Sequence, residues 1–87
     1  MLKIVAHQRD RHNTLRLEGD VIGVWVDELR RSSEEVLASG DRLVVDLADV
    51  GFVDRGGVEL LQTLVGRGVA LANASRFVVE RLKARPR

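Results

Sequence analysis

Hydrophobic and polar residues alternate in two short segments near the beginning of the chain. In residues 2–6 apolar side chains fall at every second position, and Leu15 and Leu17 repeat this spacing within residues 14–18. A period of two is typical of a strand that buries one face and exposes the other. The polar residues 7–13 between the segments predict a turn, so we expect the two strands to form an antiparallel pair.

Three later segments have the spacing of amphipathic helices. The first is predicted over residues 23–38, with Gly40 placed to end it in a left-handed conformation. The second runs from residue 54 to about residue 65, and the third over residues 74–84, with Asn73 as its N-cap and Pro86 as its stop. The positions at helical spacing are Ile22, Trp25, Val26, Leu29, Val36 and Leu37 in the first helix, Val58, Leu61, Leu64 and Val65 in the second, and Phe77, Val78, Arg81 and Leu82 in the third.

Short apolar runs at residues 43–47, 50–53 and 69–72 predict three more strand segments. The run at 43–47 is nearly continuous, which is typical of a strand buried on both faces in the middle of a sheet. The element order is therefore β-β-α-β-α-β-α, and its two strand–helix–strand units predict parallel neighbours. We expect one α/β domain over residues 1–87, a small mixed β-sheet with helices on one face, because so short a chain cannot cover both faces.

Composition narrows the classes of function. Of the 87 residues, 45% are hydrophobic and 31% charged, which is typical of a globular domain. Cysteine is absent, which excludes a disulfide, a thiolate nucleophile and a cysteine-ligated zinc. No apolar run approaches the roughly 18 residues of a membrane span, so direct membrane insertion is not expected. From residue 67 onward there are six basic residues and one acidic, but no interleaved aromatics, and the preceding part is net acidic. This charge pattern favours a solvated helix face, or contact with a polar partner, over nucleic-acid binding.

The turn at residues 54–57 has the most distinctive chemistry. Asp54 lies where a helix N-cap belongs, and we expect its carboxylate to accept hydrogen bonds from the amides of Gly56 and Gly57, with the Arg55 guanidinium beside it. Each glycine weakens a first helical turn by up to about 1 kcal/mol relative to alanine. A sequence tolerates this where the backbone approaches another group closely. Two interpretations stay open: a docking or anion-binding helix N-terminus, and a tight turn with a capping aspartate.

A resemblance to a known family rests on residues 43–61, Leu-Val-Val-Asp-Leu-Ala-Asp-Val-Gly-Phe-Val-Asp-Arg-Gly-Gly-Val-Glu-Leu-Leu. This segment resembles the core signature of STAS domains, the sulfate-transporter and anti-sigma-factor-antagonist modules. Residues 15–21 are similar to the family's second strand and the turn that follows it, and the resemblance covers about residues 14–82. It implies a small mixed sheet with helices on one side and a non-enzymatic role in protein interaction.

Two serines of the family motif are replaced in this chain. In the anti-sigma-factor antagonists, the second serine of Asp-Ser-Ser-Gly is phosphorylated by a kinase that is also the anti-sigma factor, and phosphorylation breaks the complex. By the resemblance, Asp54 and Gly57 match the ends of this motif, whereas Arg55 and Gly56 replace the serines. Gly56 has no hydroxyl and therefore cannot be a phosphoacceptor, and the positive charge of Arg55 does not imitate a phosphate. The resemblance thus implies constitutive binding, or a scaffold role like that of STAS subunits in bacterial lipid-transport ATPase complexes.

The chain is also short at its C-terminus relative to the family, ending at Arg87. A missing closing element would leave apolar surface on the third helix or the sheet edge, which favours self-association. A homodimer is therefore one expectation.

We accordingly expect a bacterial, cytoplasmic protein-interaction module that acts in transcription regulation. Its expected partner is an anti-sigma-factor kinase-like protein or a transporter component. The predicted docking residues are Asp49, Asp54, Arg55, Gly56, Gly57 and Glu59, with Arg55 forming an ion pair with an acidic partner. The alternative in another class is a sensor of small anions or nucleotides at the N-terminus of the second helix. No cofactor is expected, and no enzymatic activity, because no complete catalytic set is present.

Three weaker candidates remain. His7 and His12 lie five positions apart near Asp10, but the sequence supplies no further ligands, so no metal is expected. Asp46 and Asp54 border one strand and would suggest paired acid–base carboxylates, yet Asp46 interrupts an apolar run, which favours a structural hydrogen bond. The serines have no histidine base nearby, which argues against nucleophilic catalysis.

Overall fold

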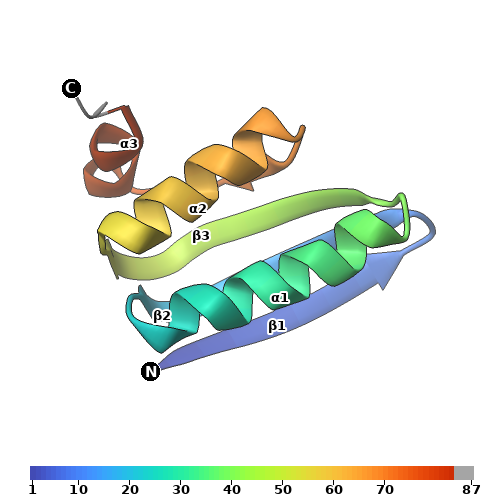
Figure 1. Cartoon of the computed structure of the whole chain (residues 1–87), viewed down its shortest axis with the longest axis horizontal. Helices are drawn as coiled ribbons and strands as arrows, with labels where there is room; N and C mark the ends of the chain where they lie inside the picture. Colours follow the sequence, from blue (N-terminus) through green and yellow to red (C-terminus); the bar gives the residue numbers. More distant parts are fainter. Residues whose placement is uncertain (84–87) are drawn as a thin grey trace.

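The apolar runs of the sequence assemble into one sheet, over which the amphipathic segments lie as helices (Figure 1). The computed structural model describes residues 1–83. Within these residues the elements are β1 (Leu2–Arg9), β2 (His12–Val21), α1 (Val24–Ala38), β3 (Arg42–Val53), α2 (Arg55–Gly66), β4 (Ala70–Ala72) and α3 (Arg76–Lys83). The predicted order β-β-α-β-α-β-α is confirmed.

The strands lie in the order β1-β2-β3-β4. β1 and β2 are antiparallel, whereas β2 with β3 and β3 with β4 are parallel, as expected for two strand–helix–strand units. α1 packs on β2 and β3, and α2 packs on β3 and β4, on the same face of the sheet. α3 lies beside α2 at one end of the sheet (Figure 1). The helices therefore leave β1 as an edge strand that neither α1 nor α2 covers well.

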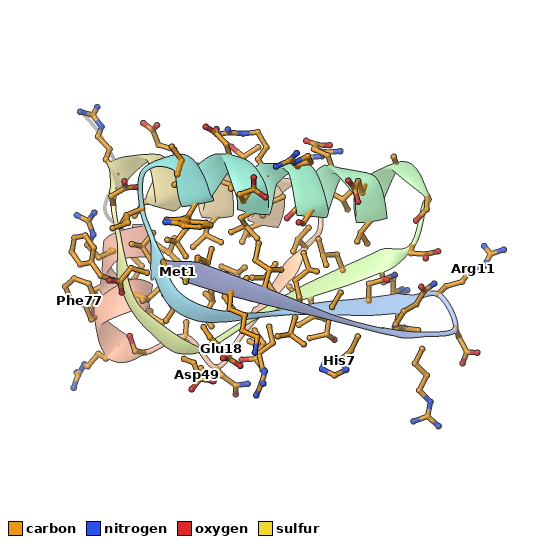
Figure 2. The ribbon with its side chains drawn as sticks, turned by 90° about the horizontal axis from the view of Figure 1, so that it is seen from below. Met1, His7, Arg11, Glu18, Asp49 and Phe77 are labelled. Atoms are coloured by element: carbon orange, nitrogen blue, oxygen red, sulfur yellow. The ribbon has the colours of Figure 1, made fainter. Side chains whose placement is uncertain are left out.

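The opposite face of the sheet is open (Figure 2). His7, Glu18 and Asp49 project from it, away from the layer of α1 and α2. Val44 and Asp46 are only half-buried. The prediction that residues 43–47 are buried on both faces is therefore wrong, although their central position in the sheet is right. α1 and α2 both pack on one face, and α3 lies at one end of the sheet.

The hairpin between β1 and β2 is tighter than predicted. The ladder continues through Gln8 with Asn13 and Arg9 with His12, so Asp10 and Arg11 alone form the turn, and the predicted turn over residues 7–13 is wrong. Asp10 has a φ of 57°, a left-handed conformation that aspartate tolerates well. The polar residues misled the prediction because this part of the hairpin extends beyond the helices and has no core to face.

β3 is one continuous strand of 12 residues that contains both predicted apolar runs, as the predicted element order requires. Its pairing with β2 shifts register twice, once between Arg16 and Glu18 of β2 and once between Gly19 and Val21. An extra residue at each shift changes which positions face the core, so that the alternation in the sequence is interrupted without a break in the strand.

The core between sheet and helices is built from leucine and valine. Its members are Leu2, Leu15, Leu17, Val21, Val26, Leu29, Leu43, Val45, Leu47, Val50, Val53, Val58, Leu60, Leu61, Leu64, Val69 and Val78. Two predicted core positions are wrong: Val65 is 51% exposed while Leu60 is buried, and Phe77 is 48% exposed while Val78 is buried. The apolar stripe of each short helix is wider than the face that it buries, and only the position of the neighbouring elements selects the edge that faces inward.

The beginning of α3 also differs from the prediction. The Ser75 hydroxyl accepts a hydrogen bond from the Val78 N–H at 3.2 Å, so Ser75 caps the helix, and Asn73 does not. Asn73 instead adopts a left-handed conformation, and its side-chain amide donates to the Asp46 carboxylate at 3.2 Å. The predicted end near residue 84 and the stop at Pro86 lie outside the described residues. The predicted role of Gly40 is confirmed by its φ of 82° just after α1.

Candidate functional site

Asp54 links the N-termini of two helices. It follows β3 in an extended conformation, and its Oδ1 accepts a hydrogen bond from the Gly57 N–H at 2.8 Å, as an N-cap does. Its Oδ2 accepts a second bond, at 2.9 Å, from the N–H of Gly23, the residue before α1. The predicted cap of α2 is therefore present, and the same carboxylate also holds the beginning of α1.

These contacts favour the ionised carboxylate. The N–H groups of Gly23 and Gly57 lower the pKa of Asp54 below its ordinary value, with a smaller contribution from the positive charge of Arg81. The negative charge lies at the positive ends of two helix dipoles. An anion that approaches the N-terminus of α2 would be repelled by the Asp54 carboxylate. It would also compete with that carboxylate for the Gly57 N–H, which already donates to Asp54.

The two glycines of the turn have different surroundings. Gly57 is buried, and a Cβ there would lie 2.6 Å from Cγ1 of Val53 and 2.7 Å from the carbonyl oxygen of Val21. At Gly56 a Cβ would meet only the Asp54 carboxylate, at an ordinary 3.6 Å. Close packing inside the domain thus requires glycine at position 57, whereas position 56 has room for a side chain.

Arg55 and Glu59 project from the first turns of α2. Their side chains are exposed and lie 3.7 Å apart between Nε and Oε2. An exposed pair of this kind contributes little to stability. Both charged groups are therefore accessible to a partner.

The structure separates Asp49 from the other predicted docking residues. Asp49 lies on the open face of the sheet (Figure 2), at the position of β3 that is opposite Glu18 in the β2–β3 backbone register. Asp46 also faces this side, and its Oδ1 accepts from the Ala48 N–H and the Asn73 amide, which lower its pKa. Its predicted structural role is confirmed. Asp46 and Asp54 are eight residues apart along β3, roughly 26 Å at 3.3 Å per residue, and do not form a carboxylate pair.

An exposed aromatic pair, which the sequence did not reveal, borders the turn. The rings of Phe52 and Phe77 stack at 5.8 Å between centroids, and each residue is more than two-fifths exposed. The Arg81 guanidinium lies 5.9 Å from the Phe52 ring and donates to the Val53 carbonyl at 2.9 Å. Because Phe52 precedes the buried Val53 in β3, the strand pattern predicts that its side chain points away from the core. Nothing in the sequence predicts its contact with Phe77.

The remaining candidates do not converge on a site. Within residues 1–83, no group of three or more histidine and acidic side chains is arranged to hold a metal ion. In the same residues, no helix is long and apolar enough to cross a membrane. The basic residues of the C-terminal part are dispersed: Arg67 binds Glu34 at 2.6 Å, and Arg81 binds β3.

A small mixed sheet with helices on one face, and an aspartate-capped turn from β3 into α2, define a STAS-type domain. The family model described as "Mlab, STAS domain" matches residues 4–85, and the chain belongs to this family. STAS domains are in general non-enzymatic modules of protein–protein interaction. A search of curated proteins gave no match.

Solved structures agree on the fold. An anti-sigma-factor antagonist STAS domain from Rhodobacter sphaeroides matches with a TM-score of 0.53 at 21% identity, over 86% of this chain and 92% of that one. An uncharacterized protein with a SpoIIAA-like fold from Shewanella loihica matches with a TM-score of 0.59 at 11% identity, over 87% of this chain and 69% of that one. The predicted family and fold class are thereby confirmed.

Proposed function

We propose that this protein is a non-enzymatic interaction module that binds a protein partner at the N-terminal end of α2. The α2 docking surface comprises Val24, Phe52, Arg55, Gly56, Glu59 and Phe77. One observation carries the proposal: of the five large apolar side chains that are exposed within residues 1–83, three gather around Asp54. Phe52 precedes Asp54 by two residues, Phe77 stacks on Phe52, and Val24 follows Gly23, whose N–H bonds the Asp54 carboxylate. An exposed apolar patch rimmed by charges is typical of a protein-binding surface.

The predicted docking residues divide into two roles in this proposal. Arg55, Gly56 and Glu59 are accessible and contact the partner directly. Asp54 and Gly57 act by shaping the turn, since the first caps two helices and the second permits close packing. Asp49 belongs to a different face and is not part of the docking surface.

The partner binds without a phosphorylation switch at position 56, because Gly56 has no hydroxyl. The partner that we propose is a bacterial cytoplasmic protein, either an anti-sigma-factor-type kinase or a transporter component. The fold of the Rhodobacter sphaeroides antagonist supports the first, and the loss of the serine supports the second, since a constitutive scaffold needs no release step.

Copurification from the native host with a tagged chain tests this proposal. We expect a stoichiometric partner with the wild type, and its loss with Phe77→Asp and with Arg55→Glu. Val65→Asp is the matched control, because Val65 is equally exposed but lies in the last turn of α2, far from the docking surface. Each variant is checked by circular dichroism. Equal recovery of the partner by all the variants would show that the α2 docking surface is not used.

A further inference from the structure

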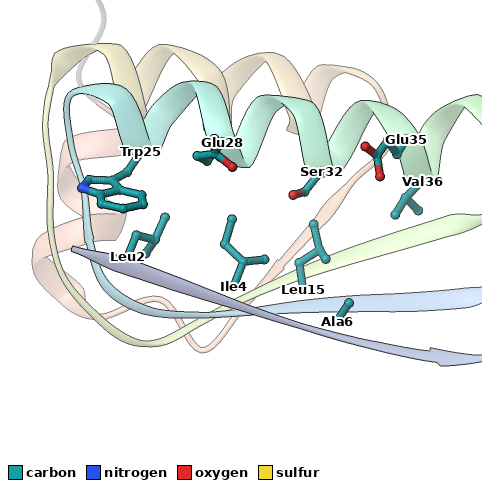
Figure 3. Close-up of a pocket in the computed structure, with 9 residues that line it drawn as sticks. All are labelled: Leu2, Ile4, Ala6, Leu15, Trp25, Glu28, Ser32, Glu35 and Val36. Carbon is teal, nitrogen blue, oxygen red and sulfur yellow. The ribbon is translucent and has the colours of Figure 1, made fainter.

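A groove of about 380 Å³ runs between α1 and the edge strand β1 (Figure 3). Leu2, Ile4 and Leu15 line its floor, and Trp25 lies at one end above Leu2. The groove exists because α1 packs on β2 and β3 and leaves the helix-facing side of β1 partly uncovered. Ile4 is accordingly only half-buried, and Ala6 is exposed.

The outer edge of β1 offers unpaired backbone groups. β1 pairs with β2 on one side, and no strand of residues 1–83 lies on its other side. Its eight residues contain no proline and no bulge, two features that keep other edge strands from pairing. A strand added to this edge would point every second side chain into the groove.

The helix wall of the groove is acidic, from Glu28 beside Trp25 to Glu35 at the far end. Glu28, Ser32 and Glu35 line it (Figure 3). Glu28 forms an ion pair with Arg31, whereas Glu35 has no ion-pair partner among residues 1–83. This wall therefore favours a basic side chain in the occupant.

The spacing along α1 fixes where that basic residue falls. Trp25 and Glu35 are ten positions apart on α1, which corresponds to about 15 Å along the helix axis. An extended strand covers the same length with four to five residues. Two successive groove-facing side chains would then lie against Trp25 and Ile4, and the third would reach Glu35.

We infer that β1 and α1 form a second binding site, which takes an extended segment of a partner protein as an additional strand. The segment has apolar side chains at two alternate positions and lysine or arginine at the next. The groove shares no residue with the α2 docking surface, so the failure of one proposal leaves the other standing.

Fluorescence of Trp25, the single tryptophan of the chain, reports on occupancy. The probe is a seven-residue threonine peptide with valine at its second and fourth positions and lysine at its sixth. The reversed order is measured too, since the strand can add in either direction. We expect one of the two to bind with a Kd of about 10–100 μM, and the version with glutamate for lysine to bind about two- to fivefold more weakly. N-methylation of the backbone that faces β1 should abolish binding.

Glu35→Lys is expected to weaken binding of the lysine peptide about two- to fivefold. Glu80→Lys makes the same charge change on the exposed side of α3 and should leave the affinity unchanged. The inference fails if neither lysine peptide changes Trp25 fluorescence up to about 1 mM. It fails as well if the Glu35→Lys and Glu80→Lys proteins bind the lysine peptide with equal affinity. It also fails if sedimentation shows a dimer that Ala6→Lys converts to a monomer, because a second copy would then occupy the groove.

Discussion

Replacing Asp54 should destabilise the protein more than any other single change at the turn that leaves the core intact. In Asp54→Ala both carboxylate hydrogen bonds are lost, the one from Gly57 and the one from Gly23. Loss of an N-cap costs about 1 kcal/mol, and up to about 2. The second bond is charge-assisted but partly exposed, so it adds about 1 kcal/mol. We therefore expect a loss of about 2–3 kcal/mol in the free energy of unfolding, which for a domain of this size lowers Tm by roughly 8–24 °C.

A serine at the same position separates the two contributions. Serine caps a helix about as well as aspartate, but its shorter side chain has one oxygen and cannot also reach Gly23. Asp54→Ser should therefore lose about 1 kcal/mol, the contribution of the Gly23 bond alone. Asp49→Ala removes a carboxylate from the open face and should change stability by less than about 0.5 kcal/mol.

The measurement is urea unfolding followed by circular dichroism, repeated at several pH values. The pKa of Asp54 is lowered in the folded state, so the stability that its charge contributes is fully present above its ordinary pKa of 3.8 and is lost as the pH falls below it. The difference between wild type and Asp54→Ala should thus shrink on going from pH 6 to about pH 3. The bridging role would be refuted by a loss below about 1 kcal/mol for alanine, by serine and alanine variants of equal stability, or by a difference that does not depend on pH.

Three further predictions concern the same turn and the core. Gly57→Ala should destabilise the protein by about 1–3 kcal/mol in thermal unfolding, because its Cβ would overlap Val53 and the Val21 carbonyl, whereas Gly56→Ala should stabilise it by about 0.4–1 kcal/mol; equal effects would contradict the packing argument. Ser33→Ala should raise stability by about 1 kcal/mol, since the Ser33 hydroxyl is fully buried and has no hydrogen-bond partner within residues 1–83; an unchanged or lower Tm would mean that the hydroxyl is satisfied. Isothermal titration with phosphate, sulfate and GTP should give no saturable heat, because the charge of Asp54 lies at the N-terminus of α2; saturation by any of them would favour the sensor.

The order of the elements was predictable from the sequence because it depends on local patterns. Alternation at Leu15 and Leu17, the helical stripes and the apolar run around Val45 each reflect burial on one side of a short segment. The cap at Asp54 was predictable for the same reason, since its bond to Gly57 spans only three residues. The resemblance around residues 43–61 belongs to this local kind of information as well.

Errors occurred where distant elements select the outcome. Leu60 and Val65 are both apolar and both border the stripe of α2, and the packing of α2 on the sheet buries only the first. Asn73 has the chemistry of a cap, yet it bonds Asp46 of β3, which the chain brings near only after folding. The turn of the first hairpin was overestimated because its polar residues extend beyond the core.

The candidate site shows the same division. A capped, glycine-containing turn into α2, with no hydroxyl at position 56, was predictable from the sequence alone, because these properties belong to consecutive residues. The hydrogen bond from Gly23 to Asp54 and the stacking of Phe52 on Phe77 become visible only in the folded chain. These contacts join residues about 25 to 31 positions apart. Their physical reason is the parallel arrangement of β2, β3 and β4, which brings the connections after these three strands to one end of the sheet.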